Sequence, residues 1–237
     1  QQAVLCLHRV REMLIGQRTA TINQLRGLLA EFGLTAPIGR RALHKAIPAL
    51  LEDLAKISPT FLINCIRQQW ERLGELDQHI NNVTTQIEMH ARQSDVTRRL
   101  QTIPGIGPIT ASALEAYVGN ATQFRAGRQL AAWLGLVPRQ HSTGGKPTLL
   151  GTSKRGDGYL RRLLVHGART VVASVRRSSN VQKQDKTIMG WLTRKHMNVA
   201  VVAMANRNAR IAWAVMTQER SFDRNFRDQL ANQLAAA

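Results

Sequence analysis

Residues 62–90, LINCIRQQWERLGELDQHINNVTTQIEMH, contain the most regular pattern in the chain. Seam positions recur there at alternating steps of four and three residues: Leu62, Ile66, Gln69, Leu73, Leu76, Ile80, Val83, Ile87 and His90. This heptad seam predicts a long helix that packs lengthwise against a second helix. We expect a homo-oligomer joined through this coiled-coil region, because a strict 3.5-residue period favours supercoiled pairing. The alternative is an intramolecular hairpin with the first helix of the same chain.

Helical periodicity also precedes the seam. Between Leu7 and Phe32 the apolar positions follow a period close to 3.6, and Gly33 is well placed to end that helix. The expected apolar face comprises Leu7, Val10, Leu14, Thr21, Leu25, Leu28 and Phe32. A shorter helix is expected over residues 40–56, and Ser58-Pro59 is typical of the start of the next.

The composition changes after about residue 95. Gly and Pro become frequent between residues 103 and 158, and two further helices are expected at about 158–176 and 198–218. The second is apolar almost all round and is therefore the expected core helix. We expect a mostly all-α fold with three parts. These are an antiparallel helical linker over 1–95, a domain over 96–220 with a helix-hairpin-helix and a Gly-rich basic loop, and a frayed tail over 221–237.

The charge balance indicates a polyanionic partner. Lys and Arg number 33 against 15 Asp and Glu, a formal charge of +18, and nucleic acid is the first candidate. No apolar stretch approaches the roughly 18 residues of a membrane span, and the N-terminus shows no signal pattern. Cys6 and Cys65 lack metal-site spacing. We expect a cytoplasmic, nucleoid-associated protein without a membrane partner.

Residues 100–111, LQTIPGIGPITA, have the pattern of a helix-hairpin-helix. One helix is expected to end at Ile103, and another to start near Pro108 and run to about Val118. Free N–H groups at that start would point at a phosphate, and glycines would let a duplex backbone come close. The alternative is an ordinary helical turn that packs on the core. The expected nucleic-acid contacts here are Gly105, Gly107 and Thr110.

Residues 133–146, WLGLVPRQHSTGGK, open a basic loop expected to extend to residue 158. Ser142 or Thr143 offers a hydroxyl nucleophile, whose attack on a phosphodiester requires a base and nearby cations. His141 is a candidate base. The alternative is a phosphate clamp without covalent chemistry. The expected phosphate-binding residues are Arg139, His141, Thr143, Gly144, Gly145, Lys146, Lys154 and Arg155.

The acidic residues do not indicate a metal centre. A metal-dependent nuclease needs several carboxylates that converge on its ions. The acids after residue 95 show no clustering in the sequence: Glu115, Asp157, Asp185, Glu219, Asp223 and Asp228. We therefore expect no metal site and no cofactor within this chain.

Several segments together carry a family resemblance. The densest is residues 127–146, GRQLAAWLGLVPRQHSTGGK, and the others are residues 8–11, 23–33, 104–108, 150–157 and 206–210. Over nearly its whole length the chain resembles the DEDD-type insertion-sequence transposases, the IS110 and IS1111 groups. The resemblance implies a helical linker that leads to a C-terminal domain with a nucleophilic serine. That serine falls on Ser142, with Thr143 as the competing register.

The same resemblance implies an N-terminal RuvC-like domain in which three Asp and one Glu hold a divalent metal. No segment of this chain resembles that domain, so we expect Mg²⁺ only in a part that this chain lacks. The resemblance also implies a covalent phosphoserine intermediate with DNA and a non-coding guide RNA.

DNA transposition or recombination is thus the leading hypothesis, with a chain that is inactive alone. The alternatives are a non-catalytic nucleic-acid-binding remnant and a dimerising scaffold.

Overall fold

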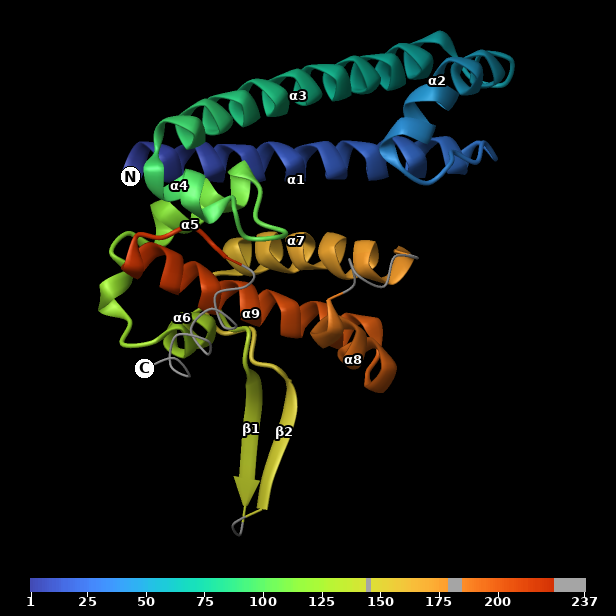
Figure 1. Ribbon diagram of the computed structural model, residues 1–237. Coiled ribbons are helices and arrows are strands. Elements are labelled where there is room, and N and C mark those ends of the chain that lie inside the picture. The colour runs from blue at the N-terminus through green and yellow to red at the C-terminus, as the bar shows by residue number, and fades with distance from the viewer. Residues whose placement is uncertain (144–145, 179–184, 224–237) are drawn as a thin grey trace, which may run out of the picture. The chain divides into compact units, whose positions relative to one another are not determined.

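The computed structural model describes residues 1–143, 146–178 and 185–223. Most of these residues are helical, which confirms the expectation of a mostly all-α fold (Figure 1). The chain divides into two compact units. The arm is Leu5–Ile87, and the C-terminal domain takes in Gln1–Val4 and the chain from Glu88 onward. Each unit has its own core.

The arm contains α1 (Gln2–Glu31), α2 (Arg40–Ala55) and α3 (Thr60–Gln93). The seam of α3 is filled from within this arm. Ile66 and Leu73 share one apolar cluster with side chains of α1 and α2, and Leu76 and Ile80 share another with Leu14 of α1. This arrangement corresponds to the hairpin alternative, and oligomerisation of the chain stays a prediction.

Helix α1 ends as its glycine predicts. Gly33 has a φ of +75°, and the Leu34 N–H donates to the Leu29 carbonyl oxygen at 3.0 Å, which satisfies an orphan carbonyl at the helix end. The predicted apolar face is wrong at Val10, which is 40% exposed. The predicted N-cap is also wrong. Helix α3 starts one residue beyond Pro59, and the Ser58 hydroxyl has no partner among the described residues.

The domain is built around one long helix. Its elements are α4 (Asp95–Leu100), α5 (Pro108–Val118), η1 (Ala121–Gln123), α6 (Gly127–Trp133), β1 (Pro138–Thr143), β2 (Lys146–Thr152), α7 (Gly158–Arg177), α8 (Lys186–Arg194) and α9 (Met197–Gln218). Helices α4, α6, α7 and α8 pack on α9. The expectation that this segment is the core helix is confirmed, and its buried residues lie on one face: Ala200, Val201, Met204, Ala205, Asn208, Ala209, Ala212 and Val215.

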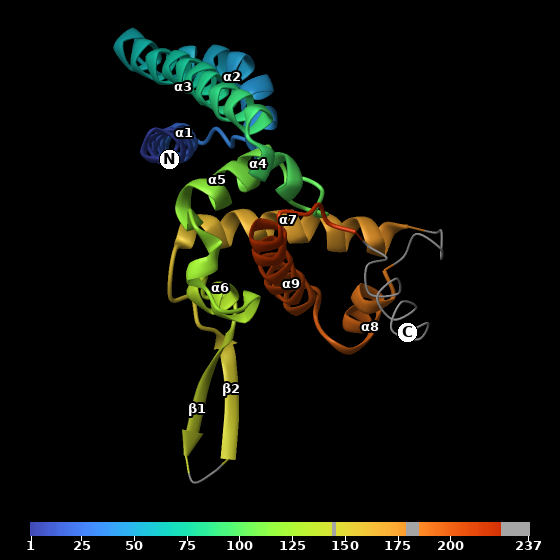
Figure 2. The same ribbon diagram turned by 60° about the vertical axis from the view of Figure 1, so that its left-hand side comes forward.

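The expected Gly-rich loop is instead a β-ribbon. Strands β1 and β2 pair antiparallel, with Ser142 opposite Pro147 and His141 opposite Thr148. The ribbon of β1 and β2 projects away from the helices of the domain (Figures 1 and 2). These strands were not predicted because they lack the alternation of apolar and polar residues that is typical of a half-buried strand. A solvated ribbon buries neither face and needs no such alternation.

Among the helices of the described residues, none is long and apolar enough to cross a membrane.

Candidate functional site

Two glycines fix the base of the ribbon. Gly135 has a φ of +70° and Gly156 a φ of +98°. A Cβ on Gly135 would overlap the Arg155 carbonyl oxygen, and a Cβ on Gly156 would overlap the Trp133 carbonyl oxygen. The segments before and after the ribbon therefore touch backbone to backbone, and only glycine fits at both contacts.

Two side chains tie this base to the helices. Asn206 of α9 donates from Nδ2 to the Leu136 carbonyl oxygen at 3.2 Å, and Arg161 of α7 donates from Nη1 to the Leu134 carbonyl oxygen at 3.2 Å. Asp157 caps α7 by accepting the Leu160 N–H at 2.7 Å. This acid thus serves the helix start, and the ribbon is held at its base by α7 and α9.

Ser142 lies on β1, and its side chain is exposed. The Gln140 amide donates from Nε2 to the Ser142 Oγ at 2.9 Å. The two side chains share a face because side chains alternate along a strand. The same alternation directs His141 to the opposite face, which is unfavourable to the hypothesis that His141 is the base for Ser142. Gln140 was not singled out from the sequence, although its spacing of two from the serine was visible there.

The expected phosphate-binding residues spread along the ribbon. Arg139 is exposed on β1, and Lys154 and Arg155 are exposed at the ribbon base. Ser142 is four residues beyond Pro138, about 13 Å along the strand. Lys154 and Arg155 therefore suit a different phosphate from the one that Ser142 would reach.

The remaining predicted residues of this segment are described only in part. Thr143 and Lys146 pair at the end of the ribbon, and their backbones alone are described. Gly144 and Gly145 lie outside the described residues. The choice between Ser142 and Thr143 as nucleophile stays open.

Helix α5 starts at Pro108 as predicted, while α4 ends at Leu100, short of the predicted Ile103, and the helix-hairpin-helix stays a prediction. Gly105 has a φ of +87°, and a Cβ there would lie 2.7 Å from the Gly167 carbonyl oxygen of α7. Contact with the protein's own helix thus accounts for Gly105 without a duplex. Gly107 has open space, whereas Thr110 is only 7% exposed. Their roles as nucleic-acid contacts stay predictions.

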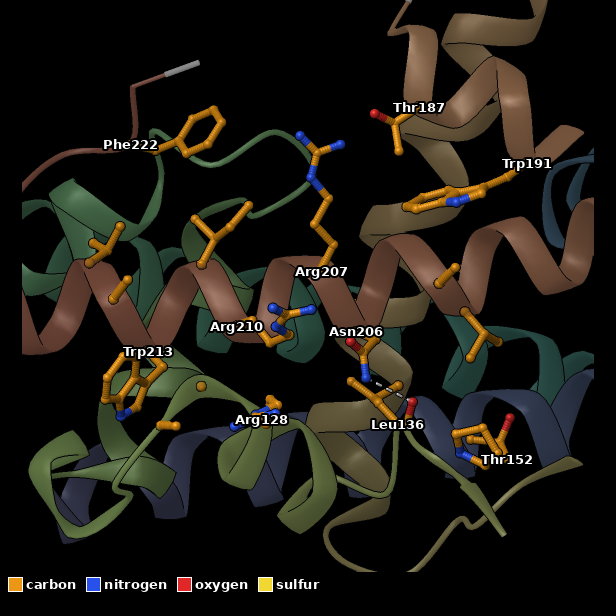
Figure 3. A pocket seen from close by; sticks show the side chains of 18 of the residues that line it. Arg128, Leu136, Thr152, Thr187, Trp191, Asn206, Arg207, Arg210, Trp213 and Phe222 are labelled. Atoms are coloured by element: carbon orange, nitrogen blue, oxygen red, sulfur yellow. Dashed lines mark hydrogen bonds between the residues drawn. The ribbon is translucent and has the colours of Figure 1, made fainter. Parts of the chain in front are cut away.

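A groove runs along α9, and it was not predicted from the sequence. Its volume is about 1270 Å³, and α6, α8, α9 and the ribbon base contribute to its walls. Arg128, Arg207 and Arg210 line it together with Trp191 (Figure 3). We call this the α9 groove. The spacing of Arg207 and Arg210 could have indicated it, because residues three apart on a helix share a side.

Asp185 organises the α8 side of the groove. Its carboxylate accepts the Thr187 N–H at 2.9 Å and the Ile188 N–H at 3.2 Å, and it pairs with Arg207 at 3.1 Å. Burial acts to raise the pKa of Asp185, but the Ile188 N–H, the Arg207 charge and the Thr187 N–H together lower this pKa below its ordinary value. The carboxylate is thereby kept charged, and it holds Arg207 in place.

The described acids do not form a ligand set for Mg²⁺. Within residues 1–143, 146–178 and 185–223, no three His, Cys, Asp or Glu side chains gather as metal ligands would.

Comparisons with known proteins connect this site to a family. Residues 97–185, which include the ribbon and α7, match the family described as Transposase IS116/IS110/IS902. A probable family 20 transposase of Pseudomonas aeruginosa is 48% identical over 223 residues, which are 92% of this chain and 64% of that protein. Over residues 97–185 this chain is similar to the IS116/IS110/IS902 transposase family.

Other relatives carry related names. The transposase for insertion sequence element IS1111A of Coxiella burnetii is 39% identical over 225 residues, 94% of this chain and 60% of that protein. A pilin gene-inverting protein of Moraxella lacunata is 28% identical over 240 residues, 90% of this chain and 71% of that protein. The chain spans 60–64% of the length of the transposases of Pseudomonas aeruginosa and Coxiella burnetii that it matches.

Proposed function

We propose that this chain is the DNA-handling part of a transposase or recombinase and that Ser142 is its nucleophile. The observation that carries the proposal is the Gln140–Ser142 hydrogen bond of 2.9 Å on an exposed ribbon, inside the segment that matches the transposase family. The bond orients the serine oxygen, and the ribbon that carries it projects away from the helices of the domain (Figure 1). The names of the relatives, transposases and a gene-inverting protein, support the same class of reaction.

The proposed step is a transesterification at phosphorus. The Ser142 Oγ forms a bond to phosphorus, the P–O bond to one deoxyribose oxygen breaks, and that oxygen leaves with the electron pair. The serine proton passes to a base. Neither Gln140, a neutral amide, nor His141, on the other face, is placed for that task. The product is a phosphoserine joined to one DNA end, and the reverse attack by a new DNA oxygen rejoins the strand.

The cations of the ribbon bind and neutralise the DNA backbone. Arg139 lies where the register of β1 shifts between Pro138 and Gln140, and we assign it to a backbone phosphate beside the ribbon, because a guanidinium binds two phosphate oxygens at once. Lys154 and Arg155 bind a phosphate nearer the domain. The formal charge of +18 adds the long-range attraction that nucleic-acid binding needs. A guide RNA and a homo-oligomer belong to the proposed assembly, with Mg²⁺ held outside this chain.

Covalent trapping tests the proposal. The purified chain is mixed with nicked DNA from the ends of the element, Mg²⁺, and the N-terminal part of a full-length relative. We expect a protein–DNA adduct on denaturing gels, with mass spectrometry locating the phosphate on Ser142. Ser142→Ala abolishes the adduct, whereas Thr143→Ala retains it. An adduct that survives Ser142→Ala and disappears in Thr143→Ala assigns the other hydroxyl.

A second function is favoured by the strand geometry, because β1 directs His141 to the face opposite Ser142 and the described part of the ribbon offers no other candidate base beside the serine. In that case the chain is a non-catalytic nucleic-acid-binding remnant that competes with an intact transposase. Its signature is the absence of any adduct, together with DNA affinity that falls steeply as salt rises.

A further inference from the structure

We infer that the α9 groove binds a single-stranded segment of nucleic acid, separate from the strand that Ser142 attacks. Arg128 and Arg210 hold its phosphates, and the Trp191 indole stacks on one of its bases. The inference rests on the proposed function only in that the partner is a nucleic acid.

The size of the groove indicates a polymer. Its volume of about 1270 Å³ exceeds the roughly 300–1,000 Å³ that is usual for sites of drug-sized ligands. The residues that α9 contributes to its lining run from Asn198 to Gln218, about 30 Å of helix. A chain of several nucleotides spans such a length, because successive phosphates of a stacked strand are about 3.4 Å apart along the axis.

The charges of the groove suit phosphate. Arg128 and Arg210 are both exposed. A Cβ on Gly127 would lie 2.9 Å from the Arg210 carbonyl oxygen, so α6 meets α9 closely at this point and brings the two arginines to adjoining walls. Arg207 already pairs with Asp185 at 3.1 Å, and we give it a positioning role. Two neighbouring guanidinium groups are well suited to consecutive phosphates of one strand.

Trp191 supplies the stacking surface. Its ring is half-buried against the domain core, while it also lines the groove. We do not assign the stacking role to Trp213, because its indole N–H donates to the Ala121 and Phe124 carbonyl oxygens at 3.2 and 3.0 Å. Figure 3 shows Trp191 on one side of α9, and Arg210 and Arg128 on the other. A strand that crosses α9 thus meets phosphate-binding groups and then an indole.

The Trp191 indole favours a single strand over a duplex as the occupant of the α9 groove. Bases in a duplex are stacked on one another, whereas an unpaired base presents its face to an aromatic ring, which contributes about 1–3 kcal/mol by alanine substitution. The groove also adjoins the ribbon base, because Leu136 and Thr152 line it. A strand held there enters or leaves the reaction region beside the ribbon.

Fluorescence anisotropy with short, end-labelled oligomers of thymidine or uridine tests the inference. We expect Arg210→Gln to weaken binding about three- to tenfold and to reduce the salt slope by about 0.7, the loss of one single-strand phosphate contact. The matched control is Arg98→Gln on α4, which removes the same charge from a side chain that is 62% exposed and outside the groove lining. The control retains nearly full affinity.

Two further variants test the stacking. Trp191→Leu weakens binding at least fivefold, whereas Trp191→Phe, which keeps an aromatic face, restores most of the affinity. Circular dichroism establishes that each variant is folded. Equal losses of affinity in Arg210→Gln and Arg98→Gln would overturn the inference. So would an unlabelled duplex that displaces the labelled oligomer as well as an unlabelled single strand does.

The two oligomers separate the possible sources of the strand. Tighter binding of thymidine indicates a displaced DNA strand, and tighter binding of uridine indicates RNA; either supports the groove as a single-strand site. Failure of the Ser142 adduct with groove binding retained refutes the proposed function alone, and the reverse result refutes the groove alone.

Discussion

Gly105 and Gly167 bring two backbones into direct contact. A Cβ on Gly105 would lie 2.7 Å from the Gly167 carbonyl oxygen, and a Cβ on Gly167 would overlap the Gly105 carbonyl oxygen. The contact joins the turn between α4 and α5 to the interior of α7. It explains why a helix interior contains a residue that costs about 1 kcal/mol relative to alanine.

The contact predicts that Gly167→Ala destabilises the protein although alanine favours helices. We expect a net loss of about 1–3 kcal/mol in the free energy of unfolding, because the added methyl forces α7 away from the α4–α5 turn. Urea denaturation followed by circular dichroism measures it. The control is Gly190→Ala in α8, where the nearest contact of the new Cβ is an Arg194 side-chain nitrogen at 3.7 Å. That variant gains stability, and a gain for Gly167→Ala as well would contradict the contact.

Local sequence signals predicted most helices of this protein. They failed where a residue is explained by a contact with a partner that is distant in the sequence. The helical turn around Gly105 is readable because Pro108 and two glycines punctuate it. The partner of Gly105 is invisible in the sequence, so the glycine was interpreted as a nucleic-acid contact. The seam of α3 likewise specifies a packed helix without naming its partner, which the structure places in α1 and α2.

The candidate site was likewise predictable only in part. Ser142 and the basic residues near it were identified from composition and resemblance, but the ribbon that carries them was not, because neither of its faces is buried. The α9 groove was missed for the opposite reason. Many apolar residues between 198 and 218 indicated a core helix, while the fully buried residues lie on one face and Arg210 is exposed.

Gly156→Ala is predicted to loosen the ribbon base. Gly156 has a φ of +98°, and its Cβ would overlap the Trp133 carbonyl oxygen, so alanine strains the backbone and pushes apart the two segments that enter the ribbon. Hydrogen exchange is expected to accelerate at the backbone amides of residues 135–137 and 139–142. Gly151→Ala on β2 is the control, because its Cβ has open space. Unchanged exchange in Gly156→Ala would refute this account of the base.

The Asp185–Arg207 pair predicts how stability depends on pH. The pKa of Asp185 lies below its ordinary value in the folded protein, so its charge stabilises the fold above the unfolded pKa of about 3.9. That contribution disappears as pH falls through the folded-state pKa. Asp185→Asn, which keeps a good cap, is therefore less stable than the parent at pH 7 and approaches it in acid.

Asp185→Ala also removes the cap of α8, which costs about a further 1 kcal/mol at every pH. Thermal unfolding of the parent and both variants over a pH series separates the two effects. A pH-independent difference between the parent and Asp185→Asn is incompatible with a charge that stabilises the fold.

Leu73→Ala distinguishes the hairpin from a dimer in the arm. Leu73 is fully buried in the cluster shared by α1, α2 and α3, so its truncation is expected to cost about 2–5 kcal/mol. Because the seam is filled within one chain, the melting temperature of both parent and variant is independent of protein concentration. Phe61→Ala, at a side chain that is 76% exposed, changes stability little. A melting temperature that rises with concentration in the parent, and less in Leu73→Ala, would instead assign the seam to a second copy of the chain.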